Sequence, residues 1–489
     1  MIRKTTMSDP IEAIKKFAKD LSPEAKIFYP GSAGYEHSVS SYYWVSSEQN
    51  PLLVFQPAVA QDITMFFKLL AGHQKLSFAI KGGGHIAPPG FSSTTGLLVD
   101  MALFRQVNYH ADTQTVDIGP GRLWQDVYKL LPPDRTVAGA SSCAGVGVAG
   151  FNLGGGYSNK TNQFGLAIDN IQSIDVVVPS GEVLKVCEIS NEDLFWALKG
   201  GGNNFGIVTN WTMITQAQGP IYSQTYQYTL DQSVKVVDAI INYSTNVDPL
   251  SNIETYWEWT VDNGKLTPII TAECFYDRLT PPTEVFQEFE AIPHTTPTPA
   301  FDNWLDRMAA LPGNRQSHRL GWGAEVVDDL PPFRGRFSCV MLSGFKKELI
   351  AATLAVFGPL SIDFISHGGV QMYPDFWPFN PSLFDNSKDC AWPHVKGSPN
   401  TPLVLNFKWQ GEENDAYWVP MIEKITSQLT AAAIELGCAV ADAPVYYNLA
   451  ADGVAVASIY QGNLDKLSSI RQKWDSTKVM DRTGGFRIP

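Results

Sequence analysis

Short apolar runs and helical patterns alternate along the first 217 residues of the chain. The apolar residues Ile63, Phe66, Phe67 and Leu70 recur at helical spacing and predict a helix within residues 59–73. Two further helices are expected over residues 124–131 and 194–198, and buried strands over residues 51–55, 76–80, 97–101, 115–119 and 174–178 and from residue 207. This alternation predicts an α+β domain over residues 41–217, with residues 1–40 as an N-terminal lead-in.

The pattern changes near residue 218, where longer strands are expected. Residues 257–261 and 266–275 flank the turn Asp262-Asn263-Gly264, which predicts a β-hairpin. Further strands are expected over residues 336–345, 362–368 and 403–409, and helices near residues 228–244, 282–291, 346–357 and 415–437. We therefore predict a second domain over residues 218–439, with an antiparallel sheet covered by helices on one side, followed by a C-terminal segment over residues 440–489.

Composition and charge exclude several classes of protein. The net charge of −13 argues against a nucleic-acid partner and against an anionic membrane surface. The chain has no apolar run of about 18 residues, so no transmembrane helix is expected. The first 20 residues lack the apolar core of a secretory signal, so we expect a cytoplasmic protein. The six cysteines show no metal-ligand spacing, so no metal site is predicted.

Three glycine-rich segments lie within the first predicted domain. The first, Gly82-Gly83-Gly84-His85, follows the buried strand over residues 76–80, and the others occupy residues 143–157 and 193–209. Glycine can adopt φ > 0 and lets backbone N–H groups approach a ligand closely. Consecutive amides form an anion-binding concavity, beside which Lys81 adds a positive charge. The segments predict a long ligand along the main chain, and the absence of a G-x-G-x-x-G turn opening a helix argues against a Rossmann unit.

The three segments resemble the PCMH-type FAD-binding domain of the vanillyl-alcohol oxidase superfamily, specifically its berberine-bridge-enzyme-like and fungal oligosaccharide-oxidase branch. Residues 164–170, Phe-Gly-Leu-Ala-Ile-Asp-Asn, and the closing Gly484-Gly485-Phe486 support the resemblance. It covers residues 40–217 and 440–489 well and the middle of the chain loosely. It implies a two-part FAD-binding domain, to which residues 440–489 return, and a substrate-binding domain over residues 218–439.

The resemblance also implies how FAD is attached. His85 matches the His bonded to the flavin 8α-methyl group, and a His that is only hydrogen-bonded in a turn is the alternative. Cys143 lies three residues before Val146-Gly147-Val148, where bicovalent relatives carry a Cys bonded to flavin C6. Those relatives usually have Pro after this Cys, whereas this chain has Ala144, and a buried small apolar Cys is the alternative.

Other positions follow from the same resemblance. The diphosphate is expected on the amides of residues 82–86, the isoalloxazine and ribityl along residues 146–151 and 155–156, and the adenine side at residues 206–208. Val148 matches a residue that controls oxygen access, and ordinary packing is its alternative. Asp169 and Asn170 are expected beside the pyrophosphate or as turn caps. The expected cofactor-binding residues are Lys81, Gly82, Gly83, Gly84, His85, Ile86, Cys143, Val146, Gly147, Val148, Gly150, Phe151, Gly155, Gly156, Asp169, Asn170, Gly206, Ile207 and Val208.

The catalytic base is sought on the strand over residues 403–409, because relatives carry theirs there. Its inward positions, Val404, Asn406 and Lys408, include no carboxylate. Tyr446 matches a Y-x-N segment from which oligosaccharide oxidases draw a base, and this role requires a pKa well below about 10. Asn406 and His367 are the further catalytic candidates, although a lone His is more often structural.

The resemblance implies an FAD-dependent oxidase that acts on a small-molecule substrate and O2. A hydride would pass from a substrate C–H to flavin N5, the proton to Tyr446 or water, and O2 would be reduced to H2O2. We expect a tailoring enzyme of fungal specialised metabolism. The alternatives are a flavin-dependent cyclase or isomerase without net oxidation, an oligosaccharide (carbohydrate) oxidase, and a flavin-binding protein without catalysis. The sequence predicts no particular oligomeric state.

Overall fold

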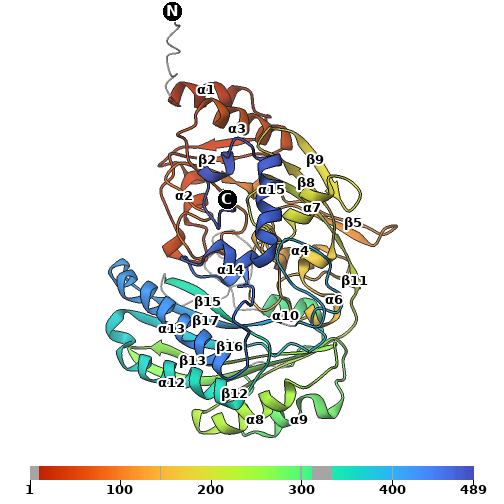
Figure 1. Ribbon diagram of the computed structural model, residues 1–489, viewed down its shortest axis with the longest axis vertical. Helices are drawn as coiled ribbons and strands as arrows, with labels where there is room; N and C mark the ends of the chain where they lie inside the picture. Colours follow the sequence, from red (N-terminus) through yellow and green to blue (C-terminus); the bar gives the residue numbers. More distant parts are fainter. Residues whose placement is uncertain (1–9, 144, 298–299, 311–332, 399) are drawn as a thin grey trace, which may run out of the picture.

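The computed structural model describes residues 10–143, 145–297, 300–310, 333–398 and 400–489 (Figure 1). A four-stranded sheet opens the chain, in the order β1 (Lys26–Phe28), β2 (Leu53–Gln56), β4 (Leu97–Asp100) and β3 (Phe78–Lys81), with β4 parallel to both β2 and β3. Helices α1 (Pro10–Lys19) and α3 (Ala60–Gly72) pack on it, and α2 (Ala33–Ser40) lies beside β2. The helix predicted over residues 59–73 is confirmed, because Ile63, Phe66, Phe67 and Leu70 of α3 are buried in one core cluster.

A five-stranded antiparallel sheet follows. Its order is β5 (Val107–His110), β6 (Thr115–Ile118), β10 (Ile207–Ile214), β8 (Ile171–Val177) and β9 (Val183–Cys187). The connecting segments contain α4 (Trp124–Leu130), α5 (Val148–Leu153), α6 (Thr161–Phe164) and α7 (Glu192–Leu198), and a small ribbon pairs β7 (Arg135–Thr136) with β11 (Gln216–Ala217). Helices and sheets of both pairing types confirm the predicted α+β class.

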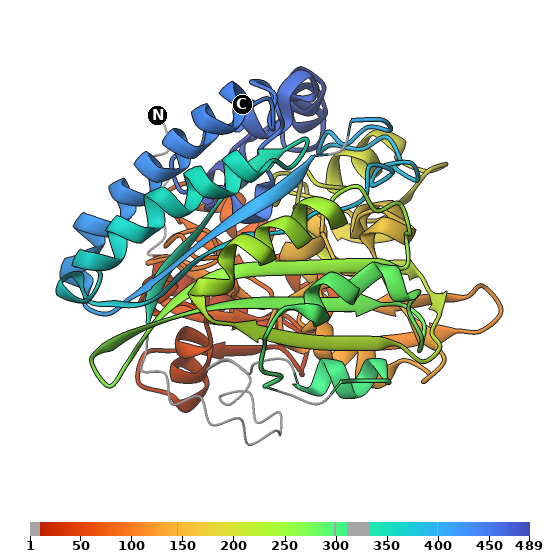
Figure 2. The same cartoon turned by 90° about the horizontal axis from the view of Figure 1, so that it is seen from below.

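The largest sheet has six antiparallel strands. Their order is β12 (Tyr222–Tyr228), β14 (Lys265–Tyr276), β13 (Ser251–Asp262), β16 (Gly369–Phe376), β17 (Thr401–Trp409) and β15 (Arg334–Leu342). Helices α8 (Ser233–Tyr243), α9 (Thr283–Ala291), α12 (Lys347–Asp363) and α13 (Asp415–Glu435) cover one face of this sheet, as Figure 2 shows from below. The predicted antiparallel sheet with helices on one side is therefore present.

The two faces of this sheet differ in chemistry because side chains alternate along each strand. On β13, Ile253, Trp257 and Trp259 are buried beneath the helices. Glu254 and Glu258, which alternate with them, line a cavity on the opposite face. The polar face is thus set by the period-two pattern of the strand itself.

The C-terminal segment packs back onto the first half of the chain. Helix α15 (Leu464–Trp474) contacts α7, and Lys473 Nζ lies 2.7 Å from Asp193 Oδ2. Asn204 Nδ2 donates a hydrogen bond to Phe486 O at 3.0 Å. In Figure 1, α14 (Val456–Tyr460) and α15 accordingly lie among the elements of the first 217 residues.

One predicted strand is wrong. Residues 362–368 form the end of α12 and the 3₁₀ turn η5 (Ile365–His367), and β16 begins only at Gly369. Gly368 ends the helical segment with φ +67°, a left-handed conformation that glycine adopts readily. The apolar residues Ile362 and Phe364 therefore belong to a helix end.

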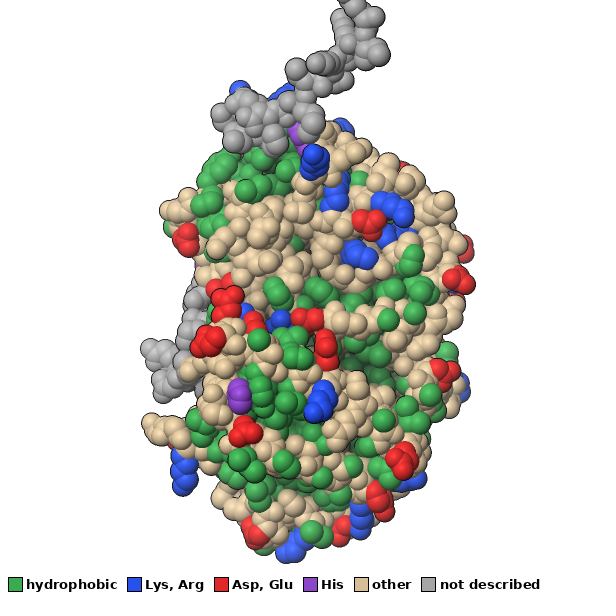
Figure 3. Space-filling view, turned by 60° about the vertical axis from the view of Figure 1, so that its left-hand side comes forward, with side chains coloured by type: hydrophobic (Ala, Val, Ile, Leu, Met, Phe, Trp, Pro, Cys, Tyr) green, Lys and Arg blue, Asp and Glu red, His purple; other side chains and the backbone are tan. Residues whose placement is uncertain are grey.

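No helix in the described ranges is long and apolar enough to cross a membrane. Figure 3 shows the Lys and Arg side chains of one face scattered over the surface.

Candidate active site

A cavity of about 450 Å³ lies between the glycine-rich segments and the uncovered face of the six-stranded sheet. Volumes of this order are typical of small-molecule sites. The expected cofactor residues that line it are Gly82, Gly83, Gly84, His85, Ile86, Cys143, Val146, Gly147, Gly150, Phe151, Gly206, Ile207 and Val208. The structure therefore brings all three glycine-rich segments to one cavity.

The first two segments meet backbone to backbone. A Cβ on Gly83 would lie 2.4 Å from Gly147 Cα, and a Cβ on Gly147 would lie 2.5 Å from Gly83 Cα. Neither position can carry a side chain without separating the segments. Gly84 adds a φ of +69° at the turn toward His85. The contact creates a cavity wall of main chain, as a ligand held by backbone amides requires.

His85 and Cys143 face each other in this wall. The Sγ atom of Cys143 lies 3.9 Å from His85 Nε2. The imidazole packs between the rings of Tyr43 and Phe337, with centroid distances of 4.4 Å and 5.9 Å. Desolvation and the charge of Lys408 lower the pKa of His85 to about 4, so its imidazole is neutral at physiological pH. Desolvation raises the pKa of Cys143 to about 11, so its side chain is a thiol.

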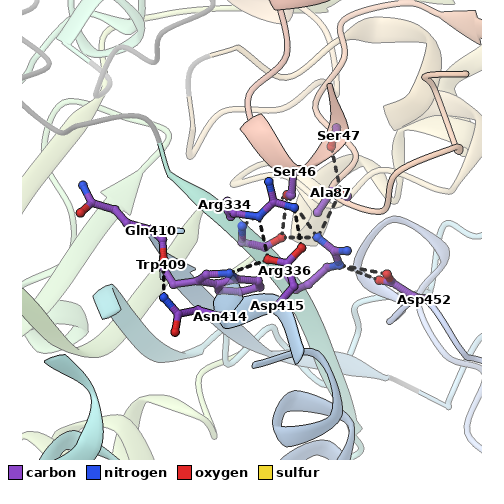
Figure 4. Close-up of polar contacts among 11 residues, drawn as sticks. Ser46, Ser47, Ala87, Arg334, Arg336, Trp409, Gln410, Asn414, Asp415 and Asp452 are labelled. Carbon is purple, nitrogen blue, oxygen red and sulfur yellow. Dashed lines mark hydrogen bonds and ion pairs between the residues drawn. The ribbon is translucent and has the colours of Figure 1, made fainter. Parts of the chain in front are cut away.

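Hydrogen bonds hold the His85 loop from outside the cavity. Trp44 Nε1 donates to His85 O at 3.1 Å, and Ser47 Oγ donates to Ala87 O at 2.8 Å. Arg336 of β15 donates from Nη1 to Ala87 O at 3.4 Å and from Nε to Asp452 Oδ1 at 2.9 Å (Figure 4). One buried guanidinium therefore connects the large sheet, the His85 loop and the C-terminal segment.

Lys81 does not line the cavity, contrary to its expected place beside a diphosphate. Its Nζ donates to Ser38 O at 2.7 Å and to Ser41 Oγ at 2.5 Å, and it lies 3.9 Å from Asp100 Oδ2. Because Ile80 lines the cavity, its neighbour Lys81 on β3 points the other way. Its charge stabilises an internal polar network.

Val148 also lies outside the cavity lining. It begins α5 and is fully buried in a core cluster with Trp124 and Val127. This is the ordinary packing that the sequence left open as the alternative to an oxygen-access role.

The four remaining expected cofactor residues, Gly155, Gly156, Asp169 and Asn170, do not line the cavity. Gly156 N donates to Tyr446 Oη at 3.0 Å, and a Cβ on Gly155 would lie 3.1 Å from the Tyr446 ring. Asp169 accepts from Leu166 N at 2.8 Å, and Asn170 Nδ2 donates to Leu166 O at 2.9 Å. These contacts match the turn-cap alternative for Asp169 and Asn170.

Tyr446 lines the cavity, but its environment does not favour a base. Its hydroxyl oxygen accepts hydrogen bonds from Gly156 N at 3.0 Å, Asn448 Nδ2 at 3.0 Å and Tyr157 N at 3.3 Å. Burial nevertheless raises the pKa of Tyr446 to about 12, and these donors only partly offset it. The shift is opposite to the one that proton abstraction requires.

Neither of the other catalytic candidates lines the cavity. Asn406 is fully buried on β17, between Phe337 and Tyr373 in the register of the sheet. The His367 ring lies in η5 and stacks on Tyr417 of α13 with a centroid distance of 3.6 Å. His367 is therefore placed with the covering helices, which removes the reason for assigning it to the site.

A wall of carboxylates that was not predicted from the sequence faces the glycine-rich segments. Glu254 and Glu258 of β13, Glu273 of β14 and Asp375 of β16 all line the cavity. The alternation of Glu254, Tyr256 and Glu258 with the intervening Ile253, Thr255 and Trp257 was the available signal. It was overlooked because the base was sought on the strand that became β17 and at Tyr446 and His367.

Three of these carboxyl groups, Glu254, Glu273 and Asp375, have raised pKa values. Burial and the charge of Glu273 raise the pKa of Glu254 to about 7, although Ser142 Oγ donates to Glu254 Oε1 at 2.5 Å. Burial and Glu254 raise the pKa of Asp375 well above its usual range. Arg307 forms an ion pair with Glu273, with Nη2 4.0 Å from Oε2. A carboxyl with a pKa near 7 can exchange a proton at physiological pH.

Known proteins match this chain in sequence and in fold. A family model described as an FAD binding domain matches residues 51–186. The FAD-dependent monooxygenase drtC of Aspergillus calidoustus is 28% identical over 517 aligned residue positions, and the match covers 99% of this chain and 93% of that protein. The carbohydrate oxidase of Microdochium nivale superposes with a TM-score of 0.76 at 19% identity, over 98% of this chain and 99% of that one. BBE-like 1 of Physcomitrella patens superposes with a TM-score of 0.74 at 18% identity, over 99% of both chains. The resemblance drawn from the glycine-rich segments is confirmed.

Proposed function

The chain carries an FAD binding domain and is an FAD-linked oxidoreductase, and from this premise we propose that it is an oxidase of a small organic molecule. One observation carries the proposal: a single cavity has the glycine-rich segments on one wall and titratable carboxylates on the other. The first wall suits a cofactor held by main chain. The second suits a substrate that must lose a proton.

The residues of the first wall fit FAD. We propose that residues 82–86 hold its diphosphate and that residues 146–151 and 206–208 hold the rest of the cofactor. His85 would form a covalent bond to the flavin, because its neutral imidazole is the nucleophilic form. Cys143, at 3.9 Å from His85 Nε2, would form the second bond. When bound, FAD supplies the acceptor for a substrate hydride and passes the electrons to O2, which yields H2O2.

The carboxylate wall supplies the proton acceptor in this proposal. Glu254 is the best candidate, because general bases work best when their pKa lies near the working pH and its pKa is about 7. Tyr446 would position the substrate with its ring and hydroxyl while remaining protonated. The substrate would lie between the glycine-rich wall and β13, with the C–H to be oxidised toward the cofactor.

The biological role follows from the relatives. Proteins named FAD-dependent monooxygenase from fungi match this chain, which supports a tailoring role in fungal specialised metabolism. Their names also support a second candidate, in which an oxygen atom enters the product. The two candidates differ in the fate of O2, because an oxidase releases both oxygen atoms as H2O2.

Acid precipitation of the purified protein tests attachment of the cofactor. Yellow colour in the pellet is expected for the unmodified protein, His85→Ala and Cys143→Ala should each retain one bond, and the double variant should release the flavin. Cys187→Ala is the control, because Cys187 ends β9 and does not line the cavity. Protein without flavin would refute the proposal.

Oxygen consumption tests the reaction. With a substrate that bleaches the flavin under nitrogen, one H2O2 is expected for each O2 consumed. Incorporation of ¹⁸O from ¹⁸O2 into the product would instead support the monooxygenase. Product formed without O2 uptake would support the cyclase or isomerase.

A further inference from the structure

Two hydrogen-bond donors hold one oxygen of the Glu254 carboxyl group. Ser142 Oγ donates to Glu254 Oε1 at 2.5 Å, and Asn159 Nδ2 donates to the same oxygen at 3.1 Å. Both donors come from the segment of residues 141–159, whereas Glu254 belongs to the sheet. The side chain of the proposed proton acceptor is therefore held by a part of the chain that lies outside its own sheet.

Ser141 fixes the direction of the Asn159 amide. Asn159 N donates to Ser141 Oγ at 3.1 Å, so this hydroxyl directs its own proton to Asn159 Oδ1, which lies 2.7 Å away. Nδ2 must then point the other way, where it donates to Glu254 and to Asn252 Oδ1, the latter at 2.8 Å. A flipped amide would instead place an acceptor oxygen against the Glu254 carboxylate.

Asn159 is not placed to touch a substrate. Only 3% of the residue is exposed, and it does not line the cavity. Its amide reaches the cavity only through Glu254, which does line it. An effect of Asn159 on the chemistry must therefore pass through the Glu254 carboxyl group.

The same donors connect the two walls of the cavity. Arg307 Nη1 donates to Ser141 O at 2.6 Å and fixes the main chain of this segment. Ser142 directly precedes Cys143, the expected second flavin attachment point. The hydrogen bond from Ser142 to Glu254 therefore joins the proton acceptor to the segment that would carry the cofactor.

We propose that Asn159 and Ser142 are positioning residues that hold the Glu254 carboxylate in place for proton transfer. This inference rests on the proposed function, in which Glu254 is the proton acceptor. A hydrogen bond to a carboxylate is stronger than one to a neutral carboxyl group, so both donors favour the charged form. They oppose burial and the charge of Glu273, which raise the pKa of Glu254 to about 7.

Other charged groups also act on Glu254, and they stay constant when only the donors are changed. The titratable and charged groups around it are Tyr256 and Glu258 on its own strand, Glu273 of β14, Tyr373 and Asp375 of β16, Lys408 of β17, Arg307 of α10 (Trp304–Ala310) and Cys143. A change in the pKa of Glu254 on removal of a donor then reports the hydrogen bond itself.

Carbon-13 NMR of the flavin-loaded protein, labelled at the side-chain carboxyl carbon of glutamate, measures the proton on Glu254 without a substrate. The Glu254 signal is the one missing from the spectrum of Glu254→Gln. Its titration midpoint should lie near pH 7 in the unmodified protein. In Asn159→Ala and in Ser142→Ala the midpoint should rise by about one pH unit, a tenfold change in the acid dissociation constant.

Asn162→Ala is the matched control. Asn162 is a buried asparagine of the neighbouring helix α6, and its recorded hydrogen bonds go to Ser251 O and Asn380 N. Loss of its amide should leave the Glu254 midpoint unchanged, although it disturbs the same region of the fold.

An unchanged midpoint in folded Asn159→Ala overturns the inference, as does an equal rise in Asn162→Ala. If Asn159→Ala does not fold, an unchanged midpoint in Ser142→Ala overturns it, because Ser142 is only partly buried and donates to the same oxygen. The oxidase proposal is judged separately by flavin content and O2 uptake. A midpoint that rises as expected in a protein that consumes no O2 would keep the hydrogen-bond network and refute the oxidase reaction.

Discussion

Glu254 of β13 lies directly opposite Glu273 of β14 in the antiparallel register of the six-stranded sheet. Natural sheets seldom oppose two carboxylates, because the pair is destabilising unless a proton or a cation separates the charges. Here the pair faces the cavity and Glu254 has a pKa of about 7. The sheet therefore tolerates an unfavourable pair where a proton acceptor is needed, which makes the pair a candidate for function.

The pH dependence of catalysis should follow Glu254. Because the carboxylate is the active form of a base, kcat/KM should rise as pH increases through about 7 and level off above it. Glu254→Gln should lower the rate of flavin reduction by about 10²- to 10⁴-fold and remove this rise. Stopped-flow reduction under nitrogen over a range of pH measures both. A variant that keeps the rise would show that another group is the base.

The raised pKa of Glu254 should also make the free energy of unfolding depend on pH, in a direction that can be predicted. Between the usual Glu pKa of about 4.3 and the raised value, the folded state binds more protons than the unfolded state. The contribution of Glu254 to the free energy of unfolding therefore falls as pH rises through this window. Relative to the unmodified protein, Glu254→Gln should become more stable with rising pH, by about 1 to 3 kcal/mol in total.

Urea unfolding of both proteins at several pH values checks this difference. Titratable groups that do not interact with Glu254, such as His85 with its lowered pKa, cancel in the comparison. A difference that does not change with pH would contradict the raised pKa of Glu254.

Tyr446→Phe should leave the pH profile unchanged, because a hydroxyl with a pKa of about 12 stays protonated over the working range. The change removes the acceptor of Gly156 N and Asn448 Nδ2, so the protein should lose about 1 to 3 kcal/mol of stability. Thermal unfolding and stopped-flow reduction measure the two effects. Tyr460→Phe is the matched control, because the buried Tyr460 hydroxyl has no hydrogen-bond partner within the described residues. Loss of the pH-dependent rise in Tyr446→Phe would show that Tyr446 is the base.

The glycine-rich wall could be expected from the sequence because each of its three segments is a continuous run of residues. The run of residues 82–86 needs only a strand followed by a glycine turn, whereas the meeting of Gly83 with Gly147 is a tertiary contact that was not predicted. The direction of a single side chain was harder to predict from the sequence. Lys81 was expected beside the ligand, yet it lies opposite Asp100 in the register of β3 and β4 and points away from the cavity.

The substrate wall could not be predicted in the same way. Glu254 and Asp375 are far apart in the sequence and come together only through the order of β13 and β16 in the sheet. His367 was assigned to a strand because residues 362–368 look apolar, whereas the structure ends a helix there. Strand order and register, which local patterns do not contain, decide both cases.

Arg336 offers the last prediction, because it joins parts of the chain that build the site. Its guanidinium is buried and contacts Ser46 Oγ, Ala87 O and Asp452 at once (Figure 4). Lysine keeps the charge but not the planar fork, so it cannot make these contacts together. Arg336→Lys should therefore loosen the loop of residues 82–87, which positions His85.

Arg334→Lys is the matched control. Arg334 lies on the same strand and pairs with Asp415 of α13, and none of its recorded contacts reaches the loop. Hydrogen exchange of residues 82–87 should become about tenfold faster in Arg336→Lys than in Arg334→Lys, as a loss of roughly 1.4 kcal/mol implies. The flavin retained in the acid pellet should fall in the same variant, because the His85 imidazole is then less well held toward the cofactor. Equal exchange in both variants would show that the other hydrogen bonds to the loop, such as those from Trp44 and Ser47, hold it without Arg336.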